Sequence, residues 1–512
     1  MGKKTKKSSP LTTTPKENFK KLSMTKRNEL NSYVNSLLKL GFIQTINVTE
    51  QWNQYVEIVS LLERIKMIES EISVINKKNF RRNTALDEFT KFIEDNGGKI
   101  NDVKITDFPG YDLGLEALKD FKENEMFITI PDKLVFSFDK AAENVQYAAK
   151  MVSLIASMPN ISLAFFLMIE RLNPNSFWKP YLDVLPERYS TVMYFTPTEL
   201  NELKGSSALA PALNQIKNIA RQYAVLYQIY QQLGEDPKNE IGKLLKERFT
   251  YDLYCWAVST VMTRQNLIPI TSPTTDNLTK DDNPITKPAL IPFWDMANHT
   301  NGHLTTSYNI ESHQVESLTL NECKKGEQIF IYYGNRNNTD LLVHNGFVFP
   351  NNKNESIMIR LSLSSADKLF TERNNLLEKL DIKASEYLVG ILPGPTFISE
   401  KLLGFARVFN MTKEQLDRWV ESDRAGDLLH IDCAIETECE SKAWNFIQNR
   451  LSLLLKMSPT TLDEDKELLE QSYSGAKGVK INRHKQMLIQ FRVIEKTLLT
   501  EALEFAKGRV KC

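Results

Sequence analysis

The spacing of apolar residues predicts a helical start to the folded part of the chain. From Glu50 onward, apolar residues recur at intervals of three and four, which places them on one face of a helix. They are Trp52, Tyr55, Val56, Val59 and Leu62. A second apolar stripe, Leu86, Phe89 and Ile93, ends at Asn96-Gly97-Gly98, where glycine readily adopts the left-handed conformation that closes a helix. We expect a helical region over residues 29–100.

The pattern then alternates between strand-like and helical segments. Short β-like runs at 114–118 and 126–130 precede a helical stretch from about 138 to 261, in which Thr196 to Glu199 forms a capping box. The polar residues between Asn266 and Trp294 predict a surface loop, and 327–333 alternates like a strand. After Pro350 the pattern is helical, with another capping box at Thr461 and Glu464. This order of elements predicts an α+β protein.

The ends and the most apolar stretch carry little information about function. Residues 1–21 hold seven lysines and one glutamate, which predicts a disordered basic tail that we extend to residue 28. Met151 to Leu172 is interrupted by Pro159 and carries Glu170 and Arg171, so it reads as a buried helix rather than a membrane span. We expect no membrane association.

Composition excludes several classes of function. The 64 basic residues balance the 64 acidic ones, so bulk charge gives no reason to bind nucleic acid. Five scattered cysteines without a CxxC pair argue against a disulfide framework and a structural zinc site. They are compatible with a reducing compartment. We expect a cytoplasmic protein, with the nucleus as an open alternative.

Two polar and aromatic stretches remain as carriers of chemistry, WDMANHTNGH at 294–303 and GEQIFIYYGNR at 326–336. The glycine-rich nucleotide motifs, HExxH and GxSxG are absent from the sequence. The residues of the first stretch leave three readings open. Asp295, His299 and His303 are spaced as metal ligands on a helix, but Asn301-Gly302 breaks such a helix. The others are a buried turn and a cofactor site; we expect no metal.

The two stretches together resemble the SET-domain methyltransferases. In that family an Asn-His pair, here Asn298-His299, and a later GE-x-I strand, here Gly326 to Gly334, jointly hold S-adenosyl-L-methionine. The segment 175–181 and Leu185-Pro186 resemble the subclass related to Rubisco lysine methyltransferase. The resemblance implies a SET-domain β-fold at 101–348 with a helical insertion at about 135–260. An all-helical substrate-binding domain is expected at 349–512.

Three segments, 218–224, 261–266 and 294–302, resemble the members of the subclass that methylate a histidine of actin. This resemblance implies a protein-histidine N-methyltransferase that acts on the tele nitrogen and binds actin as its substrate, and we expect a monomer. Asn266 and Trp294 separate this reading from the first alternative, a lysine methyltransferase of the same subclass. The second alternative is a non-catalytic protein-binding module.

The resemblance assigns the site residues. Tyr333 and Asn266 are the expected catalytic residues: Tyr333 faces the methyl group, and Asn266 suits the selection of the tautomer of the target imidazole. Substrate contacts are expected at Arg221, Trp294, Ile331 and Arg336. Cofactor contacts are expected at Arg82, Tyr111, Asp112, Leu113, Arg264, Asp295, Met296, Ala297, Asn298, His299 and Asn345.

Two positions depart from the family pattern. The first SET strand usually carries Gly-x-Gly, whereas this chain has Asp112-Leu113-Gly114, which places a side chain where backbone approaches the cofactor. Near the last strand, Asn345 stands where the actin-directed members have a small serine. Neither change removes a catalytic group.

Overall fold

A computed structural model describes residues 20–45, 47–75, 82–137, 158–269, 286–383, 388–474 and 481–510. Most of the predicted basic tail and residues 270–285 of the predicted polar loop lie outside these ranges. The first helix begins at Met24, so the predicted end of the tail at residue 28 is too late. Among the described helices, none is both long and apolar enough to cross a membrane.

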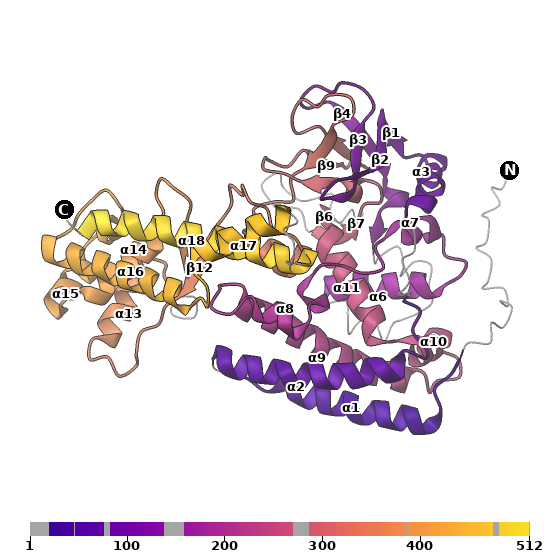
Figure 1. Ribbon diagram of the computed structural model, residues 1–512, viewed down its shortest axis with the longest axis horizontal. Coiled ribbons are helices and arrows are strands. Elements are labelled where there is room, and N and C mark those ends of the chain that lie inside the picture. Colours follow the sequence, from indigo (N-terminus) through magenta and orange to yellow (C-terminus); the bar gives the residue numbers. More distant parts are fainter. Residues whose placement is uncertain are drawn as a thin grey trace.

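The N-terminal helices pack along one side of the molecule (Figure 1). α1 (Met24–Phe42) and α2 (Val48–Glu69) lie against each other and against α9 (Leu209–Leu233). The predicted face of α2 is shifted: Tyr55, Ile58, Leu62 and Ile65 are buried, whereas Val56 is exposed. α3 (Leu86–Asp95) ends as predicted, because Gly97 has a φ of 84°.

Three small sheets make up the β-part that follows the N-terminal helices in the described residues. One has the order β1-β4-β10-β9, the second β2-β3-β11-β8 and the third β5-β7-β6. Their strands are β1 (Lys99–Ile100), β2 (Val103–Phe108), β3 (Asp112–Ala117), β4 (Met126–Pro131), β5 (Phe136–Ser137), β6 (Gln265–Pro269), β7 (Thr286–Leu290), β8 (Asn298–His299), β9 (Thr306–Asn309), β10 (Gln314–Leu318) and β11 (Gln328–Ile331). Because β1 pairs with β4, the β-region begins slightly before the predicted boundary at residue 101.

A helical insertion separates β5 from β6, as the sequence predicts. It contains α6 (Pro159–Leu172), α7 (Lys179–Val184), α8 (Pro197–Asn201), α9, α10 (Glu240–Arg248) and α11 (Tyr251–Arg264). The predicted capping box at Thr196 and Glu199 is present at the start of α8. α11 runs past the predicted end of the insertion at 260 and leads directly into β6, so the insertion delivers Arg264 and Asn266 to the sheets.

The C-terminal part is helical with one exception. Its helices are α13 (Phe370–Lys379), α14 (Glu400–Asn410), α15 (Lys413–Glu421), α16 (Thr437–Met457), α17 (Leu462–Ser474) and α18 (Arg483–Val510). The expectation of an all-helical domain is corrected in one detail, because β12 (Ile357–Arg360) and β13 (Leu388–Ile391) form an antiparallel pair. Alternate residues of this pair, such as Ile357 and Ile359, face the core, as expected for a sheet covered on one face.

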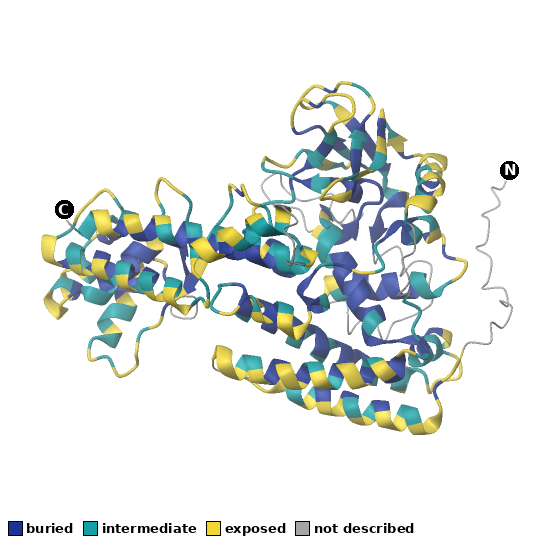
Figure 2. Cartoon of the chain, viewed as in Figure 1, coloured by how far each residue is buried: buried dark blue, intermediate teal, exposed yellow. Residues whose placement is uncertain are grey.

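Among the described residues the buried apolar side chains form two hydrophobic cores, and α18 contributes to both. Figure 2 shows buried segments in both halves of the molecule. Leu488 and Phe491 near its beginning pack in the core of the SET-like part. Farther along, Leu498 and Leu503 pack in the core of the C-terminal domain. One continuous helix therefore connects the two parts, so the C-terminal domain is not attached by a single flexible linker.

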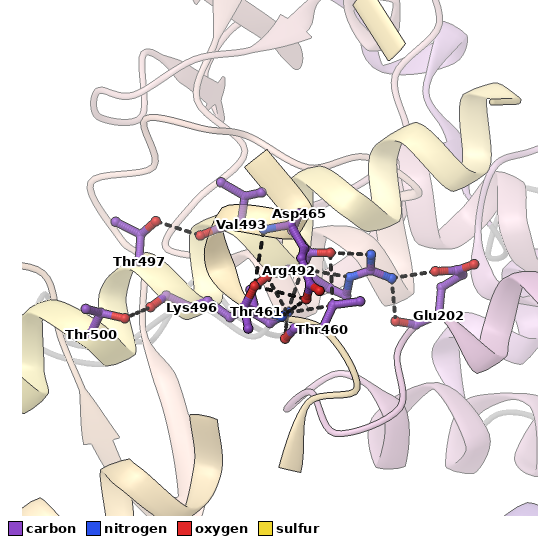
Figure 3. A network of polar contacts seen from close by, with 10 residues as sticks. Glu202, Thr460, Thr461, Asp465, Arg492, Val493, Lys496, Thr497 and Thr500 are labelled. Atoms are coloured by element: carbon purple, nitrogen blue, oxygen red, sulfur yellow. Dashed lines mark hydrogen bonds and ion pairs between the residues drawn. The ribbon is translucent and has the colours of Figure 1, made fainter. Parts of the chain in front are cut away.

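A buried ionic network reinforces this connection (Figure 3). Asp465 of α17 is fully buried and accepts hydrogen bonds from Arg492 and Lys496 of α18 at 2.6 Å each. Arg492 also pairs with Glu202, which follows α8 in the SET-like part. Charges removed from water are stable only when paired, so this network holds α17 and α18 against the insertion.

Candidate active site

The two motif stretches lie side by side in the fold. β8 pairs in parallel with β11, with Asn298 opposite Phe330 and His299 opposite Ile331. The Asn298 side chain reaches across to β3, donating to the carbonyl oxygen of Leu113 at 3.1 Å and to Gln328 Oε1 at 2.6 Å. A Cβ at Gly114 would lie 2.9 Å from Asn298 Nδ2. The glycine is therefore needed for this crossing.

A strained turn presents Trp294 and Asp295. Phe293, directly before them, is fully buried and has φ 74° and ψ −49°, a conformation that is costly for a residue with a side chain. Trp294 is then held by a hydrogen bond from its Nε1 to Thr306 Oγ1 at 2.8 Å. Such strain persists only where the surroundings enforce it, and it is common at functional sites.

Two cavities meet at this place. The larger, about 1280 Å³, is lined by ten predicted cofactor residues: Arg82, Tyr111, Asp112, Leu113, Arg264, Asp295, Met296, Asn298, His299 and Asn345. The smaller, about 170 Å³, is lined by Asn266 and by three predicted substrate residues, Trp294, Ile331 and Arg336. Tyr333 lines both cavities, as do Arg264, Asp295 and Asn345. The predicted substrate residues named here therefore line the smaller space, and the predicted cofactor residues line the larger one, with three of them at the boundary of both.

Two predicted residues lie outside this arrangement. Ala297 lines neither cavity, but its carbonyl oxygen accepts a hydrogen bond from the Tyr333 hydroxyl at 2.7 Å. Arg221 on α9 also lines neither cavity. Its guanidinium lies over the ring of Phe42 and donates to Asn218. The structure therefore places the Ala297 carbonyl against the Tyr333 hydroxyl and does not bring Arg221 into the site.

The larger cavity has a buried ionic centre. Arg264 pairs with Asp295 at 3.2 Å and donates to its backbone oxygen at 2.9 Å, while the Tyr181 hydroxyl donates to the carboxylate at 2.6 Å. Burial acts to lower the pKa of Arg264, but Asp295, Tyr189 and Tyr181 together raise it above its usual value, so the guanidinium stays charged. Burial lowers the pKa of Arg82 to about 10, with Arg264 contributing. Two cations thus face one cavity.

Unsatisfied polar atoms show that this cavity fits a ligand with both charges. In the part of the chain that the structure describes, Arg264 Nε and Asp295 Oδ1 are buried without a hydrogen-bond partner. Leaving such atoms unpaired is costly. A donor beside an acceptor in this setting suits the carboxylate and ammonium of an amino acid group, which S-adenosyl-L-methionine carries.

Tyr333 and His299 are both neutral in this environment. Burial raises the pKa of the Tyr333 phenol to about 12. Burial, with Arg336 contributing, lowers the pKa of His299 to about 4. His299 Nδ1 accepts the backbone N–H of Tyr333 at 3.2 Å, which requires an unprotonated nitrogen there. The histidine therefore fixes the segment directly after β11 that carries the tyrosine, and it is not a proton donor at pH 7.

The smaller cavity is flat on one side and polar on others. The buried Trp294 ring forms one wall. Asn266 Oδ1 accepts the backbone N–H of Leu267 at 2.8 Å and retains a second lone pair for another donor. Arg336 donates to Asn345 Oδ1 at 2.7 Å. Such a space suits a planar ring with one N–H to donate.

Sequence reasoning missed several contributors. Tyr181 lies within the stretch 175–181 that carried the resemblance, and Gln328 is the variable residue of GE-x-I. Both could therefore have been predicted as site residues from the sequence motifs. Arg483 and Gln490 of α18 also line the larger cavity. No local pattern marks them, because their place depends on how α18 docks. Within the described ranges, no group of three or more His, Cys, Asp or Glu residues could hold a metal ion.

Comparisons with known proteins identify the family and the fold. A family model described as SET domain matches residues 112–334, and one described as Rubisco LSMT substrate-binding matches residues 364–499. The chain is similar to the actin-histidine N-methyltransferase of Drosophila melanogaster, with 38% identity over 95% of this chain and 90% of that protein. The Homo sapiens protein of that name is 36% identical, over 89% and 74% of the two chains.

A solved structure has a similar fold. The structure of Rubisco LSMT bound to AdoMet superposes with a TM-score of 0.62 and 22% sequence identity, covering 83% of this chain and 92% of that one. At this identity the likeness concerns the fold.

Proposed function

Because the chain belongs to the actin-histidine N-methyltransferase family, we propose that it transfers a methyl group from S-adenosyl-L-methionine to the tele nitrogen of a histidine in actin. S-adenosyl-L-homocysteine is the second product. The observation that carries the proposal is the meeting of two cavities at Tyr333, with Asn266 and Trp294 in the smaller one. Ten predicted cofactor residues line the larger cavity, three of which also line the smaller one, and three of the four predicted substrate residues line the smaller cavity.

The nucleophile requires orientation rather than activation. An imidazole with a reference pKa of about 6.5 is mostly neutral at pH 7, whereas a lysine ammonium must first lose a proton. The bound cofactor supplies a methyl group on a positively charged sulfur, which leaves as a neutral thioether. Transfer forms the Nε2–C bond as the C–S bond breaks, and the product ring then releases its Nδ1 proton to water. Only the nitrogen without hydrogen can attack.

Asn266 selects the reactive tautomer. Its Oδ1 has a lone pair beyond the one that faces the Leu267 N–H, and this lone pair accepts the Nδ1–H of the target ring. The Nε2 lone pair is then the one that faces the larger cavity. Trp294, held by Thr306, gives the ring a flat apolar wall. Together they restrict both the tautomer and the plane of the imidazole.

Tyr333 supports the methyl group at the boundary between the cavities. Its O–H donates to the Ala297 carbonyl oxygen, so the lone pairs of the phenolic oxygen remain available as acceptors. A polarised methyl group makes weak C–H···O contacts with such an oxygen. Since the raised pKa keeps the phenol protonated, Tyr333 acts through position and not as a base.

The test is methyl transfer from labelled S-adenosyl-L-methionine to purified actin, with the modified residue located by mass spectrometry. Wild type is expected to modify a histidine. Tyr333→Phe is expected to lose about 10²-fold in rate, because alignment in the displacement is lost. Asn266→Ala is expected to lose about tenfold, the worth of one hydrogen bond to the substrate.

Tyr227→Phe is the matched control, because this phenol on α9 bonds to Asn31 and lines neither cavity. It is expected to retain wild-type rate. Methylated lysine, or transfer unaffected by Asn266→Ala, would contradict the imidazole mechanism and favour the lysine alternative. Cofactor binding without any transfer would favour the binding module. A monomeric state and a cytoplasmic location stay predictions that size-exclusion chromatography and cell fractionation would test.

A further inference from the structure

The larger cavity opens to solvent beside a pair of opposite charges from distant parts of the chain. Arg483, the first residue of α18, donates from Nη1 to both carboxylate oxygens of Asp112, at 3.2 and 3.1 Å. Its Nη2 donates to the backbone oxygen of Gly110 at 3.3 Å. Both residues line the cavity, yet their side chains are 62% and 68% exposed. They therefore stand where the cavity meets water.

Asp112 is the residue that departs from the family's Gly-x-Gly pattern. It has a φ of 61°, the left-handed region that glycine adopts freely and that aspartate tolerates better than most residues. The backbone at this position is thus compatible with the departure. What the departure adds is a carboxylate at the edge of the cavity. This carboxylate counteracts the effect of burial, the largest cause of the lowered pKa of Arg82.

Arg483 is held in place by its neighbours. Asn482 caps α18 by accepting the N–H of Lys485, and its side chain also donates to Glu199 at 2.9 Å. His484 Nδ1 lies 3.2 Å from the same carboxylate. Farther along, Leu488 and Phe491 are buried in the SET core, and Arg492 joins the network of Figure 3. The start of α18 is therefore anchored on both sides of Arg483.

This anchoring matters because exposed ion pairs are usually weak. Holding two long side chains in one geometry costs conformational entropy, and the attraction is screened by salt. Since the backbone of Arg483 is already fixed, only the side chain has to be ordered. Tyr473 of α17 and Gln490 of α18 line the same cavity, so Arg483 is not an isolated contact of the C-terminal domain.

We propose that Asp112 and Arg483 form a clasp across the mouth of the cofactor cavity, which slows the release of bound cofactor and makes the C-terminal domain a part of the cofactor site. The proposal rests on the proposed function for the identity of the cofactor. Asp112 and Arg483 are positioning residues in this view. The clasp acts on retention of the cofactor and leaves the alignment of the imidazole to Asn266 and Trp294.

The experiment measures release of labelled S-adenosyl-L-homocysteine from the full chain after a chase with excess unlabelled compound. Wild type is compared with Asp112→Asn, Arg483→Gln and the double variant, at low and moderate salt. Asparagine tolerates the left-handed backbone, so the first change removes charge without new strain. Lys485→Gln is the matched control, because Lys485 pairs with Glu202 and does not line the cavity.

Each single variant is expected to release the compound about two- to fivefold faster at low salt, the range of exposed ion pairs. The double variant is expected to be no faster than either single one, because both remove the same contact. Wild type is expected to approach the variants as salt rises, while the control behaves as wild type. The KM for cofactor rises, and the KM for actin does not.

Two results would overturn the clasp. One is a release rate of S-adenosyl-L-homocysteine that is unchanged in both single variants. The other is a release rate in the double variant that equals the product of the two single effects, because independent contacts contribute independently. A merely structural role is tested by thermal unfolding, in which all four variants are expected to have the melting temperature of the wild type. A wild-type chain that binds no cofactor would overturn the proposed function and the clasp together. If the wild type binds cofactor tightly but the single variants release it at the wild-type rate, or their effects multiply in the double variant, the clasp alone is overturned.

Discussion

Asn345 shows how a single residue connects the two halves of the site. It lines both cavities, and its Oδ1 accepts from Arg336. It is the last residue of a short π-helix, Leu341–Asn345, and is followed by Gly346 with a φ of 77°. Such irregular turns are frequent at functional sites. A serine, which the resemblance to the actin-directed members leads one to expect here, is shorter and would not span the same gap.

We expect Asn345→Ser to release Arg336 from its fixed orientation. The KM for actin should rise about tenfold, because a part-buried hydrogen bond to a charged group is lost, while kcat changes less. Steady-state kinetics with varied actin measures this effect. Asn345→Asp keeps an acceptor for Arg336 and is expected to retain the low KM. An unchanged KM in the serine variant would show that Arg336 needs no such partner.

At the scale of elements, the packing of α2 against α11 depends on one buried carboxyl. Glu69 near the end of α2 accepts the Tyr223 hydroxyl and, at 2.7 Å, the backbone N–H of Tyr251 in the first turn of α11. An acceptor at the beginning of a helix satisfies a free N–H group. α11 carries Arg264 at its other end. Glu69 thus supports the element that delivers residues to the site.

This carboxyl predicts a loss of stability with rising pH. Burial raises the pKa of Glu69 from 4.5 to about 8, although hydrogen bonds from Tyr223 and Tyr251 oppose the shift. Between these two values the unfolded chain loses its proton and the folded chain keeps it, so raising the pH favours unfolding. The contribution of Glu69 to the free energy of unfolding is fully present below pH 4.5 and is lost as the pH rises through about 8. From pH 6 to 8 it amounts to about 1–3 kcal/mol.

Glu69→Gln removes this titration and keeps an oxygen that accepts hydrogen bonds. We expect the variant to be more stable than wild type at pH 9 and to show a flatter dependence between pH 6 and 9. Urea unfolding followed by circular dichroism gives the free energies. Lys66 and Asp252 are charged neighbours that both proteins share. A glutamine variant that is less stable at pH 9 would show that the ionised carboxylate is the stabilising form.

At the scale of the whole molecule, the two cores share a helix and an ionic network. Polar interfaces between domains normally permit relative motion. Here α18 passes through both cores, and Asp465 lies between two cations within the junction. The network includes Glu202 from the SET-like part. The relative position of the domains is therefore fixed by buried charge as well as by apolar contact, and with it the place of Arg483.

Asp465→Ala is expected to destabilise the protein by about 3–5 kcal/mol, because it leaves Arg492 and Lys496 buried without their carboxylate. Thermal and urea unfolding measure the change. Glu504→Ala, on the same helix but in an exposed pair with Lys507, should change the free energy of unfolding by less than about 1 kcal/mol. Equal effects of the two substitutions would show that the network does not hold the domains together.

Local features were predictable from the sequence because neighbouring residues create them. The capping boxes at Thr196 and Thr461 are present, and the glycine stop after α3 is where its pattern places it. The same holds for the motif residues. Asn298, His299 and Tyr333 belong to short segments whose spacing in the chain carries the resemblance, and ten of the eleven predicted cofactor residues line one cavity.

The tertiary structure alone decided which distant parts of the chain contact those segments. Arg221 belongs to a matching segment, yet α9 packs it against the end of α1 and away from both cavities. Arg483 belongs to no motif, yet the docking of α18 brings it to Asp112, 371 positions away in the chain. Hydrophobic periodicity indicates roughly which face of a helix is buried, but it does not specify the partner. Contacts between distant elements depend on how whole surfaces fit, and that information is spread over the entire chain.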